Sequence, residues 1–367
     1  MKPIKYVNVN LQWKAERKKL IKIIDKTILK NNWVGGSEIQ NFENKISKYC
    51  NKKYAVALNS GTDALTLALY CLGIKRGDEV ITCPNSFIAS VSVIIHLGAK
   101  PVFVDVLPDQ NMNPSLLEKA ITKRTKAIMP VHLTGRVCEM DEIKTIAKKY
   151  NIPIVEDAAQ AIGAKYKNKM AGSFGEIGCF SAHPLKNLNA IGDSGYLVTD
   201  NRNIYKKIMS LRSHGIEDRN VVRKFGYVSR MDTIQAAILN FRLKQLTKVI
   251  AKRRHNADFY FKNLNKKNIF ISKEKEYQFN TYHTFVIQVH NRENLIKFLL
   301  KKKIYTAIHY PIPIHLQPAS KFLNHKKGDF PEVEKQANNI LTLPIHQYLT
   351  KKDLRRVCDA VNSFYNL

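Results

Sequence analysis

The sequence predicts an α/β protein, in which a large domain holds a mostly parallel seven-stranded sheet flanked by helices and a small α/β domain follows at the C-terminal end. Short apolar segments alternate with amphipathic segments between Tyr54 and Asp200. Parallel strands need crossover connections, and the crossover helices cover both faces of the sheet. Beyond Arg230 the alternation stops and a long helical pattern begins. The chain has 367 residues, of which 44% are hydrophobic, enough for a large core and a second smaller one.

The seven strands are expected at residues 54–58, 79–83, 101–105, 126–131, 152–156, 177–181 and 195–199, with helices between them at residues 62–72, 90–97, 114–121 and 141–150. A single long helix is expected from residue 232 to about 264. After it come a strand at 283–289, a helix at 291–302, a proline-rich turn at 310–318 and helices at 330–341 and 350–364.

These elements divide the chain into four parts. Residues 1–53 are expected to pack on the small domain or on a partner subunit, residues 54–231 form the large domain, residues 232–264 the linker helix, and residues 265–367 the small domain.

The charge is strongly basic, with 60 Lys and Arg against 30 Asp and Glu and a formal net charge of +30. The basic runs, such as residues 252–254 and 301–303, are interleaved with apolar helical positions. That pattern is typical of solvated helix faces, so no nucleic acid is expected as a partner.

The six cysteines are scattered without a CxxC pair, which predicts reduced thiols rather than disulfides or a zinc site. No leader-like segment and no membrane-spanning run is visible, so a cytoplasmic protein with no membrane partner is expected. There is no Gly-Lys dipeptide, no GxGxxG, no GxSxG and no HExxH, which argues against a P-loop, a dinucleotide fingerprint, a hydrolase nucleophile elbow and a metal site.

Three polar features follow predicted strands. Asp157 ends one strand, at the edge of the sheet where ligands bind, although it could instead cap the next helix. Ser60, Gly61 and Thr62 open a helix with small residues whose N–H groups can approach a phosphate, although a plain N-cap is the alternative. Lys186 lies in a loop between two strands, where a surface lysine is the ordinary interpretation.

Together these features match the needs of pyridoxal phosphate. A lysine can bind the cofactor covalently, a carboxylate can pair with the pyridine nitrogen, and a small-residue loop can hold the phosphate. The combination is much more specific than any of its parts.

The chain resembles the nucleotide-sugar aminotransferases, which are fold-type I pyridoxal-phosphate enzymes of the DegT type. Six motifs in order carry the resemblance: residues 60–65 (SGTDAL), 86–90 (SFIAS), 156–160 (EDAAQ), 179–187 (CFSAHPLKN), 226–230 (GYVSR) with Gln235-Ala236-Ala237, and 310–318 (YPIPIHLQP). The resemblance covers nearly the whole chain.

The resemblance implies a role for each motif residue. Lys186 would form the Schiff base and carry the proton, Asp157 would bind the pyridine nitrogen, and Gln160 the phenolic oxygen. Phe87 would lie over the ring, although it could simply fill the core.

The same resemblance places Ser60, Gly61, Thr62 and Ser181 around the phosphate, with a structural Ser181 as the alternative. His183, His309, Tyr310 and His315 are candidate substrate contacts, weighed against ordinary satisfied histidines. No metal is expected.

One position departs from the family pattern. Val228 stands where the family usually has an Asn that reaches the phosphate across the dimer, and valine cannot donate a hydrogen bond. Ser229 or Arg230 could substitute, or the phosphate is held less tightly.

The implied reaction moves an amino group from L-glutamate, through pyridoxamine phosphate, to a nucleotide-linked keto-sugar, in a homodimer with shared active sites. The turn Gly192-Asp193-Ser194-Gly195 resembles the subgroup that aminates C3 of a 3-keto-6-deoxyhexose for deoxyamino-sugar synthesis. The alternatives are a C4 aminotransferase, a pyridoxal-dependent sugar dehydratase and a non-catalytic regulator. The intact Lys186 argues against the last two.

Overall fold

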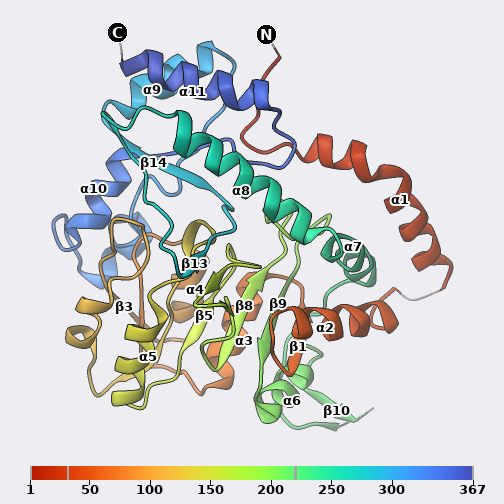
Figure 1. Cartoon of the computed structure of the whole chain (residues 1–367). Helices are drawn as coiled ribbons and strands as arrows, with labels where there is room; N and C mark the ends of the chain where they lie inside the picture. The colour runs from red at the N-terminus through yellow and green to blue at the C-terminus, as the bar shows by residue number, and fades with distance from the viewer. Residues whose placement is uncertain (1, 31–32, 219–220, 366–367) are drawn as a thin grey trace.

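The computed structural model describes residues 2–30, 33–218 and 221–365. The large sheet lies in the lower half of Figure 1, and the elements of residues 265–365 lie mostly above it. The last two residues of the predicted part 265–367 fall outside the described residues. The predicted boundaries of the four parts stay predictions.

The large sheet contains seven strands in the described chain, in the order β1-β9-β8-β5 and then β4-β2-β3. Isolated parallel bridges from Ile128 to Ile154 and from Val131 to Asp157 join the two groups. The strands are β1 (Tyr54–Leu58), β2 (Glu79–Thr82), β3 (Lys100–Phe103), β4 (Thr125–Ile128), β5 (Val155–Asp157), β8 (Ile177–Ser181) and β9 (Gly195–Thr199). Only β9 runs antiparallel to its neighbours β1 and β8. The mostly parallel seven-stranded sheet is thus confirmed, with strand ends that differ by a few residues.

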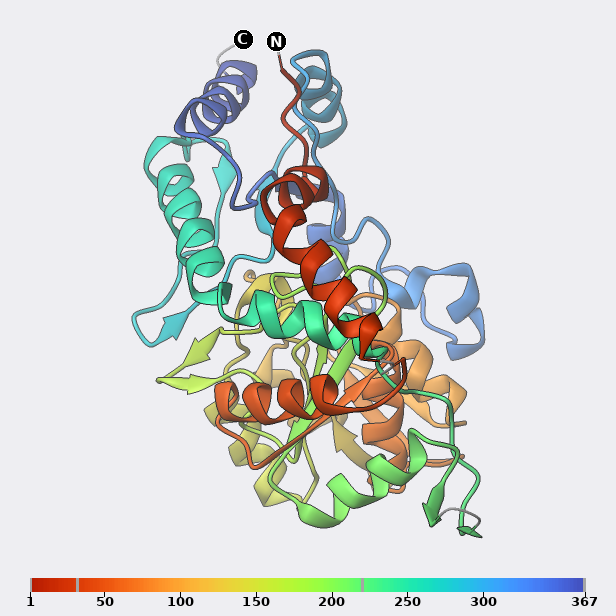
Figure 2. The ribbon, with the colours of Figure 1, turned by 90° about the vertical axis from the view of Figure 1, so that its right-hand side faces the viewer.

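Helices cover both faces of this sheet, as Figures 1 and 2 show. They are α2 (Ser37–Tyr49), α3 (Gly61–Cys71), α4 (Ala89–His96), α5 (Met140–Lys149), α6 (Arg202–Leu211) and α7 (Thr233–Leu243). Side chains of β1 alternate between two cores: Val56 and Leu58 join α3, α4 and α6, whereas Ala55 and Ala57 join α2, α5 and α7. Strand β1 is therefore buried on both sides.

The small domain forms around its own core, in which α8 (Leu246–Asn263), α9 (Arg292–Lys301) and α11 (Lys351–Tyr365) pack on a three-stranded antiparallel sheet. The strands of this sheet are β12 (Ile269–Phe270), β14 (Phe285–Val289) and β15 (Ile340–Leu343). The turns η4 (Ile314–Leu316) and η5 (Pro318–Leu323) and the helix α10 (Pro331–Asn339) lie between α9 and β15.

Three predicted helices differ from the structure. The linker is two helices, α7 and α8, because the chain leaves the helical path at Gln245 (φ −104°). Residues 114–121 form two short 3₁₀ turns, η1 (Pro114–Leu116) and η2 (Glu118–Ala120). The helix expected at 330–341 ends at Asn339, and the apolar residues after it pair with β14 instead.

The first 49 residues bridge the two domains. Ile4 pairs with Ile304 of the small domain. Helix α1 (Val9–Leu29) runs along the edge of the molecule to α7, where Glu16 forms a buried ion pair of 2.7 Å with Arg242. Helix α2 packs on β1 and α7. The N-terminal segment therefore contacts both domains, and its packing on a partner subunit stays a prediction.

Minor strands lie outside these cores: β6 (Lys165–Tyr166), β7 (Lys169–Met170) and β13 (Gln278–Phe279) form one small sheet, and β10 (Ile216–Asp218) and β11 (Val221–Val222) a two-stranded ribbon. Within the described ranges, no helix combines the length and apolar character that crossing a bilayer requires.

Candidate active site

A cavity of about 480 Å³ opens at the carboxyl ends of the central strands. Its lining contains nearly all the site residues expected from the sequence: Ser60, Gly61, Thr62, Phe87, Asp157, Gln160, Ser181, His183, Lys186, His309 and Tyr310. These residues come from five separate segments of the chain, four of which lie at or after the carboxyl ends of β1, β2, β5 and β8, where the strands end at one edge of the sheet.

His315 does not join this cavity. Its side chain is fully buried, and its Nε2 atom lies 3.0 Å from the carboxylate of Glu334. Its ring packs at 4.7 Å from the ring of Phe330. The geometry therefore places His315 outside the cavity, with its Nε2 atom paired to Glu334 and its Nδ1 atom without a hydrogen-bond partner among the described residues, and His315 is withdrawn as a substrate contact.

The loop that carries Lys186 connects β8 to the antiparallel strand β9 and is held at both ends. The Ala182 N–H donates to the Ser194 carbonyl at 2.7 Å. Farther along, the Asn189 side chain exchanges hydrogen bonds of 2.9 and 3.0 Å with Gln12 of α1, and the Gln235 side chain of α7 bonds both backbone groups of Ile191. The loop is therefore positioned by two distant helices.

The Lys186 amine has no hydrogen-bond or ion-pair partner among the described residues. Burial lowers the pKa of Lys186 to about 8, and the Asp157 carboxylate opposes this shift. A substantial fraction of the amine is therefore neutral near neutral pH, as a nucleophile requires.

Asp157 lies at the end of β5 with 5% of its surface exposed. Its Oδ2 atom accepts a hydrogen bond of 2.6 Å from the Ser90 hydroxyl, and its Oδ1 atom accepts one of 3.1 Å from the Ala159 N–H. The residue does not cap a regular helix, because no helix is assigned directly after it. A buried carboxylate that faces a cavity suits a cationic ring nitrogen.

Gln160 is oriented by the loop beside it. Its Oε1 atom accepts a hydrogen bond of 2.9 Å from the Thr134 N–H, so its amide nitrogen points toward the Tyr310 hydroxyl at 3.4 Å. Thr134 has a φ of 62°, and Gly135 after it a φ of 91°. A Cβ on Gly135 would lie 2.6 Å from the Thr281 hydroxyl, which explains the glycine.

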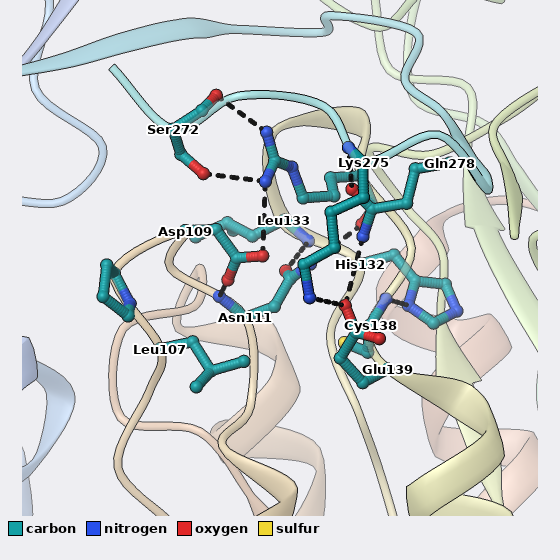
Figure 3. A network of polar contacts seen from close by, with 12 residues as sticks. Leu107, Asp109, Asn111, His132, Leu133, Cys138, Glu139, Ser272, Lys275 and Gln278 are labelled. Atoms are coloured by element: carbon teal, nitrogen blue, oxygen red, sulfur yellow. Dashed lines mark hydrogen bonds and ion pairs between the residues drawn. The ribbon is translucent and has the colours of Figure 1, made fainter. Parts of the chain in front are cut away.

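Figure 3 shows the polar network behind this loop. The Asn111 side chain accepts a hydrogen bond from the Leu133 N–H at 3.1 Å and donates to the Arg136 carbonyl at 3.3 Å. Arg136 also bonds Ser272, and Glu139 pairs with Lys275 at 2.8 Å. The network therefore links the loop next to Gln160 to residues 272–278, which precede the central strand of the small domain.

The start of α3 offers two free N–H groups. The Ser60 hydroxyl accepts from the Asp63 N–H at 3.0 Å, so Ser60 is an N-cap as the simpler interpretation held. The N–H groups of Gly61 and Thr62 still have no acceptor within the helix. A Cβ on Gly61 would lie 2.8 Å from the Ser181 Cβ, so the glycine lets the helix start pack on the end of β8. Ser60 can therefore cap the helix while the N–H groups of Gly61 and Thr62 bind a phosphate.

The far wall of the cavity is aromatic and basic. Phe87 is 54% exposed, which excludes the core-filling alternative, and its ring lies 6.0 Å from that of Tyr310. Burial lowers the pKa of His309 to about 4 and also lowers the pKa of His183, and the charge of Lys186 acts in the same direction on both. Both imidazoles are therefore neutral hydrogen-bonding groups at neutral pH.

Sequence reasoning missed several lining residues, including Tyr6, Val7, Ser90 and His283. The ring of Tyr6 packs against that of His309 in a tilted arrangement, with 5.5 Å between the ring centroids. Burial and the charge of Lys186 hold the pKa of His283 well below its usual value. Tyr6 and His283 reach the cavity through long-range packing and follow no strand of the large sheet, so no local signal marked them. Ser90 belongs to the motif at residues 86–90, but nothing in that motif indicates which side chain it contacts.

The residues present fit pyridoxal phosphate. A partly neutral lysine, an ionisable carboxylate and an amide donor surround one cavity, and two free N–H groups open a helix on its rim. Each matches one functional group of the cofactor: its carbonyl carbon, ring nitrogen, phenolic oxygen and phosphate.

Comparisons with known proteins point to the same chemistry. Residues 14–362 match the model of the DegT/DnrJ/EryC1/StrS aminotransferase family. The chain is 37% identical over 341 residues to the dTDP-3-amino-3,6-dideoxy-alpha-D-galactopyranose transaminase of Aneurinibacillus thermoaerophilus, covering 92% of this chain and 93% of that one. It is 35% identical over 363 residues, 98% of either chain, to a protein of Geobacillus stearothermophilus named a pleiotropic regulatory protein.

Two solved structures are similar over almost the whole chain. The S. venezuelae protein DesV, in complex with a ketimine intermediate, superposes with a TM-score of 0.98 at 34% identity over 100% of both chains. NtdA from Bacillus subtilis, with bound cofactor PMP, superposes with a TM-score of 0.90 at 31% identity, covering 96% of this chain and 82% of that one. These likenesses confirm the predicted fold and cofactor.

Proposed function

Because this chain belongs to the DegT/DnrJ/EryC1/StrS aminotransferase family and is a pyridoxal-phosphate-dependent aminotransferase, we propose that it transfers an amino group from L-glutamate to a nucleotide-linked 3-keto-6-deoxyhexose. The observation that carries this proposal is the convergence of Lys186, Asp157 and Gln160 on one cavity. The position of amination rests on the Gly192–Gly195 turn and on the similar transaminase of a 3-amino sugar.

When bound, the cofactor supplies a carbonyl carbon that accepts the amino group and a ring that withdraws electrons. Lys186 would hold this carbon through its amine and, when free, would move a proton at the substrate carbon. Its pKa of about 8 lets the same amine act as base and as acid near neutral pH. Asp157 would keep the proton on the ring nitrogen, and the amide nitrogen of Gln160 would donate to the phenolic oxygen, because its Oε1 atom is already bonded to the Thr134 N–H.

The substrate would approach from the wall formed by His183, His309 and Tyr310. Burial and Lys186 hold both imidazoles neutral, so they can exchange hydrogen bonds with sugar hydroxyls. Burial raises the pKa of Tyr310 to about 12, so its hydroxyl keeps its proton. These groups bind and orient, whereas proton transfer is left to Lys186.

We further propose a cytoplasmic homodimer with shared active sites. The six cysteines are unbridged, which suits a reducing compartment. The strip around Val228 exposes large apolar side chains, with Phe225 94%, Val228 57% and Tyr227 44% exposed. Such exposure is uncommon on a monomer and suits burial against a second copy. A fully active monomer in sedimentation would contradict this.

The test is turnover on a panel of substrates. The enzyme is incubated with L-glutamate and nucleotide-linked 3-keto and 4-keto sugars, and the products are identified by mass and by the position of the new amine. We expect amination at C3. Exclusive amination at C4 would refute the regiochemistry, and the absence of product from every keto-sugar would refute the sugar substrate.

A further inference from the structure

Ser90 lies beneath the cavity in an unusual position for a serine near a helix start. It stands in the first turn of α4, three residues after Phe87, and only 1% of its surface is exposed. Its hydroxyl donates to the Asp157 carboxylate at 2.6 Å, across 67 residues of sequence. The N-cap of α4 is Ile88, which makes no side-chain cap bond, so Ser90 does not serve as a cap.

This hydroxyl is one of two donors that the described residues give to the Asp157 carboxylate. The other is the Ala159 N–H at 3.1 Å, and no Lys or Arg in the described ranges lies within ion-pair distance of Asp157. A buried carboxylate without an ion-pair partner is held in place by its hydrogen bonds. Each oxygen atom accepts one of the two bonds, so the pair also fixes the plane of the carboxylate.

We propose that Ser90 is a positioning residue, which holds the Asp157 carboxylate turned toward the ring nitrogen of the cofactor. The inference rests on the role proposed above for Asp157. One short segment then performs two tasks, because Phe87 lies against the cavity and Ser90 orients the carboxylate at its base. A hydrogen bond to a charged group contributes more than one between neutral groups, so its loss has a measurable effect.

The experiment uses Ser90→Ala, with Ser90→Thr as the rescue variant that keeps a hydroxyl. Ser92→Ala is the matched control, because Ser92 lies on the same helix and its hydroxyl bonds only the Ala89 carbonyl, at 3.3 Å. Ser90→Ala is also combined with Asp157→Asn. The cofactor dissociation constant is measured from visible absorbance, the absorbance of the bound cofactor is followed against pH, and thermal unfolding of the apoprotein reports folding.

We expect Ser90→Ala to weaken cofactor binding by about tenfold to a hundredfold and to shift the pH dependence of the absorbance. Ser90→Thr should retain most of the affinity, and Ser92→Ala should match the wild type. In the Asp157→Asn background, Ser90→Ala should cause little further loss, because the carboxylate that Ser90 holds is gone.

Two results would overturn the inference. One is a Ser90→Ala variant with the cofactor affinity and pH dependence of the wild type. The other is an equal loss of cofactor affinity on Ser90→Ala in the wild-type and the Asp157→Asn backgrounds, which would mean a purely structural role for Ser90. If Asp157→Asn alone left cofactor binding unchanged, the role of Asp157 would be refuted, and this inference with it. None of these measurements needs the sugar substrate.

Discussion

The depressed pKa of Lys186 predicts how fast the apoenzyme captures its cofactor at each pH. A lysine at its ordinary value of 10.5 would be neutral in about one molecule in a thousand at pH 7.5. With a pKa of about 8, about one molecule in four is neutral, a gain of roughly 250-fold. Burial is the larger cause, and the Asp157 carboxylate limits the shift.

The assay mixes apoenzyme with pyridoxal phosphate in a stopped-flow instrument between pH 6.5 and 10. The rate is divided by that of a free lysine derivative corrected to its neutral fraction, which removes the ionisation of the cofactor itself. We expect the corrected rate to rise about tenfold per pH unit well below pH 8 and to level off above it. Asp157→Asn should move the midpoint to lower pH, because the opposing charge is lost. A rate that keeps rising to pH 10 would refute a perturbed lysine.

The same shift has a consequence for stability with a definite sign. The folded-state pKa of Lys186 lies below its unfolded value, so between about pH 8 and 10.5 the unfolded chain binds more protons. Through this window the contribution of Lys186 to the free energy of unfolding rises with pH. The difference in urea unfolding between wild-type apoprotein and Lys186→Met measures it, and a difference that falls with pH would contradict the reasoning.

Three further predictions concern single side chains. Lys186→Arg should abolish the visible absorbance of the bound cofactor and turnover while leaving apoprotein unfolding unchanged, and retained absorbance would refute the role of this lysine. Glu156→Gln should lower the free energy of unfolding in urea by about 2–4 kcal/mol. The reason is that the fully buried Glu156 carboxylate accepts hydrogen bonds from three backbone N–H groups and pairs with His132 at 2.9 Å. An unchanged midpoint of urea unfolding would count against this reasoning. Gly195→Ala should weaken cofactor binding by at least about tenfold, because the new Cβ would lie 2.2 Å from the Ser60 carbonyl carbon and displace the turn before α3; equal affinity by absorbance titration would show that the turn is not needed.

The sequence could predict the sheet and the residues at its edge because both leave local signals. Strand segments are short apolar runs, Asp157 ends one of them, and Gly61 comes three residues after the end of another. The lining residues that the sequence could not predict lie at the cavity because segments distant in the chain pack together there. Tyr6 comes from the N-terminal segment, and His283 lies in the small domain just before β14. His315 shows the opposite error, because it is close in sequence to Tyr310 and yet turns to Glu334.

The break between α7 and α8 was also beyond the sequence. Residues 243–246 contain neither Gly nor Pro, and apolar positions continue on both sides with helical spacing. The core does not change at this point either, because Leu246 and Ile250 of α8 still belong to the core shared with α2 and α7, and α8 joins the core of the small domain only from Ala257 onward. No local or packing signal therefore marks the break.

The N-terminal segment has a practical consequence for handling the protein. Ile4 is fixed beside Ile304, and the Lys5 carbonyl accepts a hydrogen bond from His346, so Tyr6 and Val7 are delivered to the cavity within a few residues of the start of the described chain. Removal of residues 4–7 would therefore take away part of the substrate wall. Kinetic measurements on this enzyme call for a protein in which these residues are intact.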